Sequence, residues 1–512
     1  MLIVAVALPL SNYLMSLGQF IMAGGWLLSA QLPARLKAAF RQPGFWLLTG
    51  LYLLHLAGLI HTEDMSYAMN DLRIKIPLWL LPLLIFSAPE LPRENAKVVL
   101  YSIMGAVLLS TMAGAAAAAG WTDRKVEDFR DLSLFISHIR LSLLIVFSMV
   151  LSVYFFFKKA NLLTRAGLVI YGVWLTAFLF MMQSITGLLL CVLLLLIYLA
   201  VVAMKGKSLT RAVALLLFAL ALFGCYSLYR YIFVDSLILP VRQMDALPER
   251  TVNGNLYKYD TTSVEMENGR YVWMQYNEFE MDSVWRKRST RSIWNPDDKG
   301  YMILVTLARY LTYKGYGRDA EGTSKLTDEE VREIEAGYAT PEYVVSKNRL
   351  LLRIRELAAE YRNWYYNGWA SGHTLAQRLE YWKTAWSIWR ENPFHGVGTG
   401  DVQDAFDDAY IKYQNRLEEP YRKRAHNQYL TMAVTFGGVG FLYFLFLLLF
   451  LFRRAILTRD PVFVSLLVIV AGSFFSEDTL ETQAGVTFFA FLVCFFLKNQ
   501  VAAGLKDVTE PA

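Results

Sequence analysis

Long apolar runs separated by short polar segments dominate both ends of the chain. A bilayer core about 30 Å thick needs about 20 mostly apolar residues per helix. Seven runs meet that length, and three shorter runs come close to it. The long runs are 44–61, 98–120, 135–157, 167–182, 187–204, 212–233 and 428–452, and the shorter ones are 76–87, 461–475 and 486–497. The pattern predicts an all-α protein that crosses a membrane many times.

The first apolar run, residues 2–32, contains no charged residue. It fits either one long helix or two short helices that break near Ser11 and Asn12. No Lys or Arg precedes it, so we do not interpret it as a secretory signal. Two helices here would give twelve spans and one would give eleven; we expect about twelve.

Basic residues indicate which loops face the cytoplasm. They cluster in alternate short loops, at 35–41, 93–97, 158–165, 205–211 and 453–459. The positive-inside rule places such loops in the cytoplasm. The intervening segments are then periplasmic, and they are 61–71, 121–133, 235–426 and 476–485. Twelve spans would put both termini inside.

Charge is concentrated in residues 235–426, which hold 27 Lys/Arg and 29 Asp/Glu. We therefore expect four parts: a membrane domain of about nine helices at 1–234, a large, mainly helical periplasmic loop domain at 235–426, about three membrane helices at 427–498, and a cytoplasmic tail at 499–512. With 55% hydrophobic and 18% charged residues, the chain cannot be one large soluble domain. The net charge of +6 is too small for a nucleic-acid partner.

Residues 235–426 contain no cysteine, so the fold of this block rests on packing. Its first part, 235–337, fits a small hairpin or a loose loop, with helices at 303–313 and, capped by Thr327, at 327–336. A later apolar stripe at helical spacing predicts a helix that packs this face against the membrane domain or the interface. The stripe comprises Leu375, Leu379, Trp382, Trp386 and Trp389.

Three glycines at two-residue spacing follow that helix, within residues 392–401. Such spacing can leave backbone N–H groups free to bind an anion, and a helix starting at Asp401 would add its positive end. Gly398 and Gly400 are therefore candidate substrate-binding residues. The alternative is that the glycines serve a tight turn.

A cationic segment leads into the apolar run at 428–452. Proline suits a first helical turn, so we expect a helix from Pro420 that places two cations on the same face as His426. Nearby cations would keep that imidazole neutral and able to accept a proton. The candidates here are Arg422, Lys423, Arg424, His426 and Asn427. The alternative is a cluster that contacts lipid phosphates beside a structural histidine.

Smaller polar clusters flank other outer span ends. Ionisable groups at such depth are candidate functional residues, although long basic side chains also anchor proteins at the interface. The clusters are Arg130, Asp131, His138 and Arg140, and His61 with Arg73. Among these, His138 and Arg140 are candidates for substrate binding.

Three short motifs together resemble the O-antigen ligase/polymerase family. They are Arg378-x3-Trp382, Asn392-Pro393-x2-Gly396-x-Gly398-x-Gly400, and His426-Asn427-x2-Leu430 with Gly437 and Gly440. The number of spans and the long late loop fit the same family. The resemblance implies a GT-C-like, metal-independent, inverting glycosyltransferase of the bacterial inner membrane, without a cofactor. Such an enzyme moves a glycan from an undecaprenyl diphosphate carrier to an acceptor hydroxyl such as that of lipid A–core.

By position, His426 matches the family's essential histidine and Arg378 its loop arginine, so these two are the candidate catalytic residues. His426 would take or orient the acceptor proton, while Arg378, Arg422 and Arg140 would neutralise the diphosphate. The family usually has an arginine in a Ser-Arg-Thr/Ala-Gly-like motif, where this chain has Ile185 within Ser184–Gly187. We expect Arg140 to substitute for it.

Other functions remain open on the sequence. Within the family, an O-antigen or exopolysaccharide polymerase is the main alternative, and a protein O-oligosaccharyltransferase is another. A transporter of lipid-linked glycan is less favoured, because transporters tend to show internal repeats and polar sites at the membrane midplane.

Overall fold

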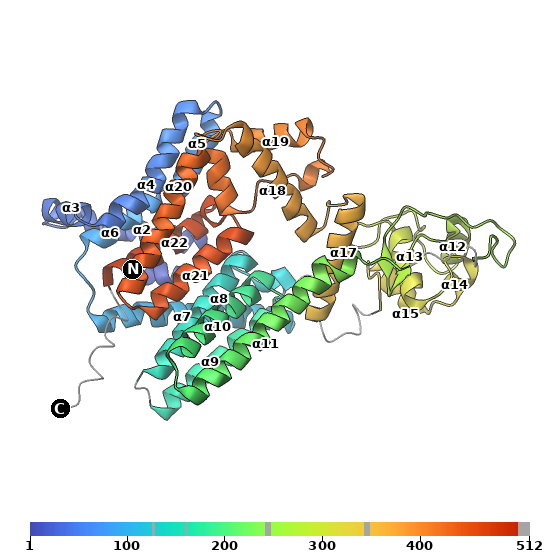
Figure 1. Cartoon of the computed structure of the whole chain (residues 1–512), viewed down its shortest axis with the longest axis horizontal. Coiled ribbons are helices and arrows are strands. Elements are labelled where there is room, and N and C mark those ends of the chain that lie inside the picture. Colours follow the sequence, from blue (N-terminus) through green and yellow to red (C-terminus); the bar gives the residue numbers. More distant parts are fainter. Residues whose placement is uncertain (125–128, 159–160, 241–246, 342–348, 500–512) are drawn as a thin grey trace. The chain divides into compact units, whose positions relative to one another are not determined.

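The computed structural model describes residues 1–124, 129–158, 161–240, 247–341 and 349–499, which are mostly helical (Figure 1). The chain divides into two compact units. The first comprises Met1–Ala221, Arg378–Asn415 and Arg422–Ala512, and the second comprises Leu222–Gln377 and Arg416–Tyr421. Residues 378–415 and 422–426, which the sequence assigned to the loop domain, group with the first unit. The limits of the four parts expected from the sequence stay a prediction.

Seven described helices are long and apolar enough to cross a membrane, and each covers one of the seven long runs. They are α4 with the following turn (Pro43–His61), α7 (Arg93–Ala118), α8 (His138–Phe157), α9 (Leu162–Met181), α10 (Ile185–Lys205), α11 (Ser208–Phe233) and α20 (Gln428–Leu457). The prediction of a helical membrane protein is confirmed in this form. A total of about twelve spans stays a prediction.

Shorter helices complete the first unit, and the N-terminal run forms two of them. The first ends at Ala7, and Ser11 caps the next, because its side chain accepts a hydrogen bond from the Leu14 N–H. The short helices are α1 (Leu2–Ala7), α2 (Asn12–Leu27), α3 (Leu32–Phe40), α5 (Met65–Lys75), α6 (Pro77–Ser87), α21 (Pro461–Ser476) and α22 (Gln483–Asn499). The core lies around α22, where Phe489 and Phe495 are fully buried.

Helices α9, α10 and α11 keep most of their apolar surface exposed. Only 17%, 17% and 6% of their most apolar stretches are buried. Exposed apolar surface of that extent is unfavourable in water but not in a bilayer. These helices therefore fit a position against lipid.

The second unit holds a small mixed fold around fully buried Trp285 and Tyr310. Its hairpin pairs β1 (Met266–Glu267) with β2 (Arg270–Tyr271) across Asn268 and Gly269, both with positive φ. Of the two alternatives for residues 235–337, a small hairpin is thus present. The helices are α12 (Glu278–Trp285), α13 (Ile303–Lys314), α14 (Ala320–Ser324), α15 (Asp328–Glu335) and α17 (Arg349–Asn367), and η3 (Asp235–Leu237) is a single turn. The predicted cap at Thr327 is confirmed as a capping box.

Two helices of the late block belong to the site, α18 (Thr374–Glu391) and α19 (Val402–Lys412). The buried face of α18 is formed by Tyr381, Ala385 and Ile388, which are 3%, 0% and 4% exposed. The predicted stripe is rotated away from that face, and Trp386 is 52% exposed. Trp386 therefore does not pack against the membrane domain, and contact of the stripe with the membrane interface stays a prediction.

Candidate functional site

The site forms around a short acidic loop between α21 and α22, residues 477–481, which we call the acidic loop. Helix α21 ends at Ser476, because Glu477 is extended at φ −150°. The loop carries Glu477, Asp478 and Glu481 within five residues. Opposite it lies the histidine segment, residues 424–428, which leads into α20.

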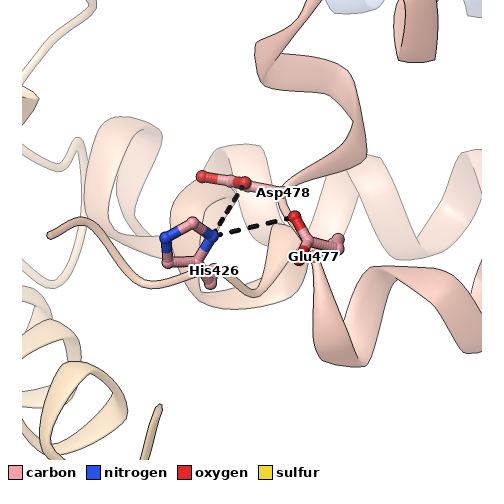
Figure 2. Close-up of side chains that lie close together, drawn as sticks. All are labelled: His426, Glu477 and Asp478. Carbon is pink, nitrogen blue, oxygen red and sulfur yellow. Dashed lines mark ion pairs between the residues drawn. The ribbon is translucent and has the colours of Figure 1, made fainter. Parts of the chain in front are cut away.

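The two candidate catalytic residues both contact Glu477. The Arg378 guanidinium on α18 donates to Glu477 Oε1 at 3.3 Å. His426 Nδ1 lies 3.7 Å from Glu477 Oε2 and 3.6 Å from Asp478 Oδ1, at ion-pair distance (Figure 2). Side chains 48 positions apart in sequence therefore meet on one carboxylate. Their catalytic role stays a prediction.

Local backbone geometry presents His426 to the acidic loop. His426 has φ +44°, which a non-glycine residue adopts only where its surroundings hold it. Asn427 caps α20 by accepting from the Leu430 N–H, and its amide donates to the Phe475 carbonyl at 3.2 Å. The Leu480 N–H donates to the side chain of Gln428 at 2.7 Å. These bonds fix the backbone immediately after the imidazole.

The carboxylates of Asp478 and Glu477 raise the pKa of His426 to about 9, against the opposing effect of burial. Burial raises the pKa of Asp478, but the close approach of the His426 imidazolium outweighs it and holds that pKa below its usual value. At neutral pH the pair is therefore an imidazolium beside carboxylates. The expectation of a neutral His426 is wrong, because its neighbours are anions rather than cations.

The expected helix from Pro420 is also wrong. Only one turn, η4 (Glu419–Tyr421), forms there, and α20 begins at Gln428. Arg422 consequently does not share a helix face with His426; its guanidinium lies 6.0 Å from the centre of the Tyr410 ring. Lys423 is exposed, and its carbonyl accepts from the Tyr410 hydroxyl.

Two further candidates contact the protein itself. Arg424 donates to the Tyr67 hydroxyl at 2.7 Å and lies 3.5 Å from Glu481. Asn427 is 5% exposed and already bonded at both ends of its amide. Arg424 and Asn427 therefore make internal contacts, and their binding of substrate stays a prediction.

The glycine turn at 396–400 is packed against α4 and α20. The four N–H groups from Val397 to Gly400 donate to the carbonyls of Val434, Thr435 and Gly58 and to the Thr62 hydroxyl. A Cβ on Gly400 would come within 2.2 Å of the Asp64 carbonyl oxygen. The prediction that N–H groups at Gly398 and Gly400 are free for an anion is wrong, and the tight-turn alternative accounts for these glycines.

Arg140 lies close to the acidic loop. It is near the N-terminal end of α8, it lines a small pocket with Thr479 and Phe488, and it experiences the charges of Glu477 and Asp478. His138 begins the same helix and is partly buried.

The residues around Ile185 reach the acidic loop from α10. The Thr186 hydroxyl donates to Ser476 at 3.4 Å, one residue before Glu477. A Cβ on Gly187 would lie 3.1 Å from Ser142 of α8. Thr186, the neighbour of Ile185, thus contacts the last residue of α21, and Arg140 experiences the charges of the loop that follows it; the substitution stays a prediction.

Residues 343–445 match the family model described as O-antigen ligase. The match includes Arg378, the glycine turn and His426, so the resemblance to the O-antigen ligase/polymerase family is confirmed. No curated protein matches the chain.

Sequence reasoning missed the carboxylates of the candidate site, because Glu477 and Asp478 lie outside the motifs that carry the family resemblance. It also missed Tyr381, which is 3% exposed and whose ring centre lies 5.7 Å from that of His426. The available signal was the density of acidic residues in a short loop between two apolar runs. His426, Glu477 and Asp478 offer ligand atoms within 4.8 Å of one another, a spacing that suits a metal ion only after the imidazole loses its proton.

Proposed function

We propose that this chain is an O-antigen ligase-like glycosyltransferase. It moves a glycan from undecaprenyl diphosphate to an acceptor hydroxyl of lipid A–core, with inversion and without a metal, on the periplasmic face of the bacterial inner membrane. The observation that carries this proposal is the meeting of Arg378 and His426 on Glu477, within the first unit and beside apolar helices. The family match supports the reaction class.

The charges suit a diphosphate leaving group. Arg378 and the imidazolium of His426 keep exposed fractions of 31% and 37%, so both cations remain accessible to a substrate anion. Arg140 and Arg422 add positive charge on further elements of the same unit. Cations placed where negative charge develops lower the barrier most effectively in a site that excludes water.

Proton transfer is divided between the histidine and its carboxylates. The acceptor oxygen attacks the anomeric carbon in line, the bond to the diphosphate breaks, and its electron pair leaves with the diphosphate. Because His426 is already protonated at neutral pH, Glu477 receives the acceptor proton and His426 orients the reacting groups. This assignment replaces the expectation that His426 itself is the base.

A reconstituted transfer assay tests the proposal. Purified protein in proteoliposomes is given an undecaprenyl diphosphate-linked glycan with lipid A–core, a second carrier-linked repeat unit, or a Ser/Thr peptide. We expect the glycan on lipid A–core. Chain elongation would instead indicate a polymerase, peptide modification a protein glycosyltransferase, and translocation without transfer a transporter, and each of these results would contradict the ligase assignment.

A further inference from the structure

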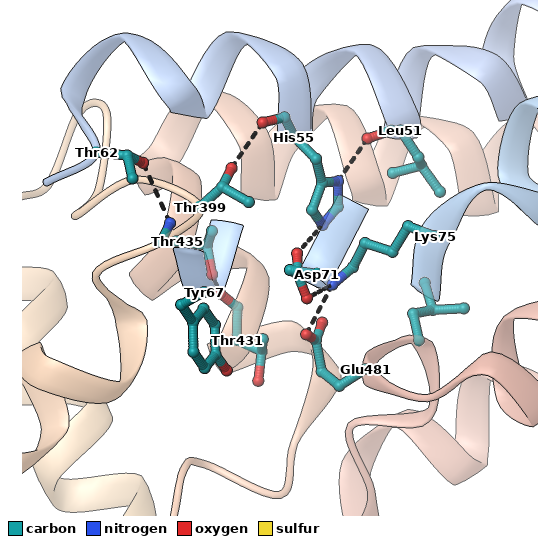
Figure 3. A network of polar contacts seen from close by, with 12 residues as sticks. Leu51, His55, Thr62, Tyr67, Asp71, Lys75, Thr399, Thr431, Thr435 and Glu481 are labelled. Carbon is teal, nitrogen blue, oxygen red and sulfur yellow. Dashed lines mark hydrogen bonds and ion pairs between the residues drawn. The ribbon is translucent and has the colours of Figure 1, made fainter. Parts of the chain in front are cut away.

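A buried charged network lies beside the proposed site, in the same compact unit (Figure 3). At its centre is Lys75 at the end of α5, which is 1% exposed. Its ammonium group donates to Asp71, one turn earlier, and to Glu481 Oε2 at 2.8 Å. A buried lysine is costly unless it is paired and hydrogen-bonded, so this arrangement calls for a role.

Glu481 collects donors from three elements. Besides Lys75, it lies 3.5 Å from the Arg424 guanidinium and accepts from the Gln428 amide at 3.2 Å. Burial raises the pKa of Glu481, but the charges of Lys75 and Arg424 outweigh it and lower that pKa to about 2. Glu481 is therefore a permanently charged acceptor.

These contacts join the two segments that form the site. Arg424 and Gln428 stand two residues before and two residues after His426, and both bind Glu481. Glu481 follows Asp478 by three residues in the acidic loop. Helix α5 holds both sides, because the Tyr67 hydroxyl accepts from Arg424 while Lys75 holds Glu481.

We propose that Lys75 is a positioning residue for the transfer reaction: by fixing Glu481, it holds His426 between Glu477 and Asp478. This inference rests on the proposed function and names a residue that the family resemblance does not assign. The strained φ of His426 makes such support necessary, because an unsupported residue would relax out of the left-handed region.

The competing explanation is that Lys75 only balances buried charge. Asp71 separates the two explanations, because it pairs with Lys75 but lies outside the site loops. Its other near neighbour is His55, whose Nε2 is 4.0 Å away. Lys75→Met together with Asp71→Asn removes one cation and one anion, so the double variant keeps the net charge but loses the link to Glu481.

Transfer kinetics in proteoliposomes test the two explanations. We expect Lys75→Met to lower kcat about 10- to 100-fold, the scale of a reacting group misplaced by about 1 Å, with little change in the donor KM. The charge-balanced double variant should regain part of the lost Tm while kcat stays low. Full recovery of kcat in the double variant, or normal kcat in Lys75→Met, would overturn the proposal.

Amide hydrogen exchange tests the positioning role of Lys75 without relying on glycan transfer. In Lys75→Met we expect faster amide exchange in the histidine segment and the acidic loop. The matched control is Asp460→Asn, because Asp460 is also 1% exposed but caps the opposite end of α21. The control should speed exchange only near residues 461–464. If the wild type transfers no glycan, the proposed function fails while the exchange test still applies; unchanged exchange in Lys75→Met would overturn the positioning role.

Discussion

The sequence of the glycine turn at 396–400 and that of the histidine segment both suggest anion binding. Only the histidine segment keeps a cationic group accessible to a substrate. In the turn, the N–H groups from Val397 to Gly400 are bonded to neighbouring protein oxygens. In the histidine segment, His426 remains 37% exposed and is bound only at ion-pair distance. Donors consumed by packing cannot bind a substrate, whereas a loosely paired, partly exposed cation can exchange its partner for one.

The largest effect should come from removing the cations that meet on Glu477. We expect Arg378→Ala to lower transfer about 10²- to 10³-fold, because one charge-assisted contact to a developing anion is lost. Arg378→Lys should rescue poorly if the contact is bidentate. Initial rates of glycan transfer measure this. Lys383→Ala on the same helix is the control, since Lys383 is 60% exposed and pairs with Glu380 rather than Glu477; near-normal rates in Arg378→Ala would remove Arg378 from the mechanism.

The imidazole should be nearly as sensitive. We expect His426→Ala to lower kcat about 10²-fold, because the variant loses both the cation and the group that orients the reacting atoms. The same transfer assay measures it, with circular dichroism as a check on folding. Wild-type rates in His426→Ala would show that the reaction does not depend on the histidine segment.

A smaller effect concerns Arg140 as the substitute for the arginine missing at position 185. We expect Arg140→Ala to lower transfer about tenfold, and Ile185→Arg in that background to restore part of the activity, because Thr186, next to position 185, bonds to the last residue of α21 and Arg140 experiences the charges of the following loop. The readout is transfer rate at saturating donor. Unchanged activity in Arg140→Ala would refute the substitution.

The pH profile distinguishes a charged from a neutral His426. Its pKa is raised to about 9, so the ion pairs are fully present below about pH 6.5 and are lost as the pH rises through 9. We expect kcat/KM to fall above about pH 9, and Asp478→Asn to move that limb toward lower pH. If neutral His426 were the general base, kcat/KM would instead rise as the pH increases through 9.

The smallest catalytic effect should come from the glycine turn. Gly398 has φ +97°, so Gly398→Ala should cost about 1–2 kcal/mol of stability through backbone strain, visible as a lower Tm. The donor KM should change less than about twofold. Gly105→Ala is the control, because Gly105 lies within α7 with nothing close to its added Cβ. A large rise in donor KM for Gly398→Ala would restore the anion-binding interpretation.

Sequence alone predicted the seven long apolar helices because each depends on a continuous apolar run, and it predicted the Thr327 cap because that signal is local. It failed where two local signals compete. Pro420 can start a helix, but Asn427 provides the side-chain cap from which α20 begins. On α18, Tyr381 and Ala385 lie at the same helical spacing as the tryptophans, and residue size did not reveal which face is buried.

The candidate site was predicted in part for a related reason. Arg378 and His426 belong to recognisable motifs. Glu477, which contacts both, lies 51 positions after His426 and belongs to none of those motifs. No spacing rule connects residues on separate helices, so their partnership emerges only from packing. Lys75 is the extreme case, because its acidic partner Glu481 lies 406 positions further along the chain.

The grouping of residues 378–415 with the first unit places the whole candidate site within one compact unit. All ten candidate site residues fall in that unit, although eight of them belong to the segment between the last two groups of apolar runs. The insertion from Leu222 to Gln377 contributes none of them. Substitutions within that insertion should therefore leave every charged group of the candidate site in place.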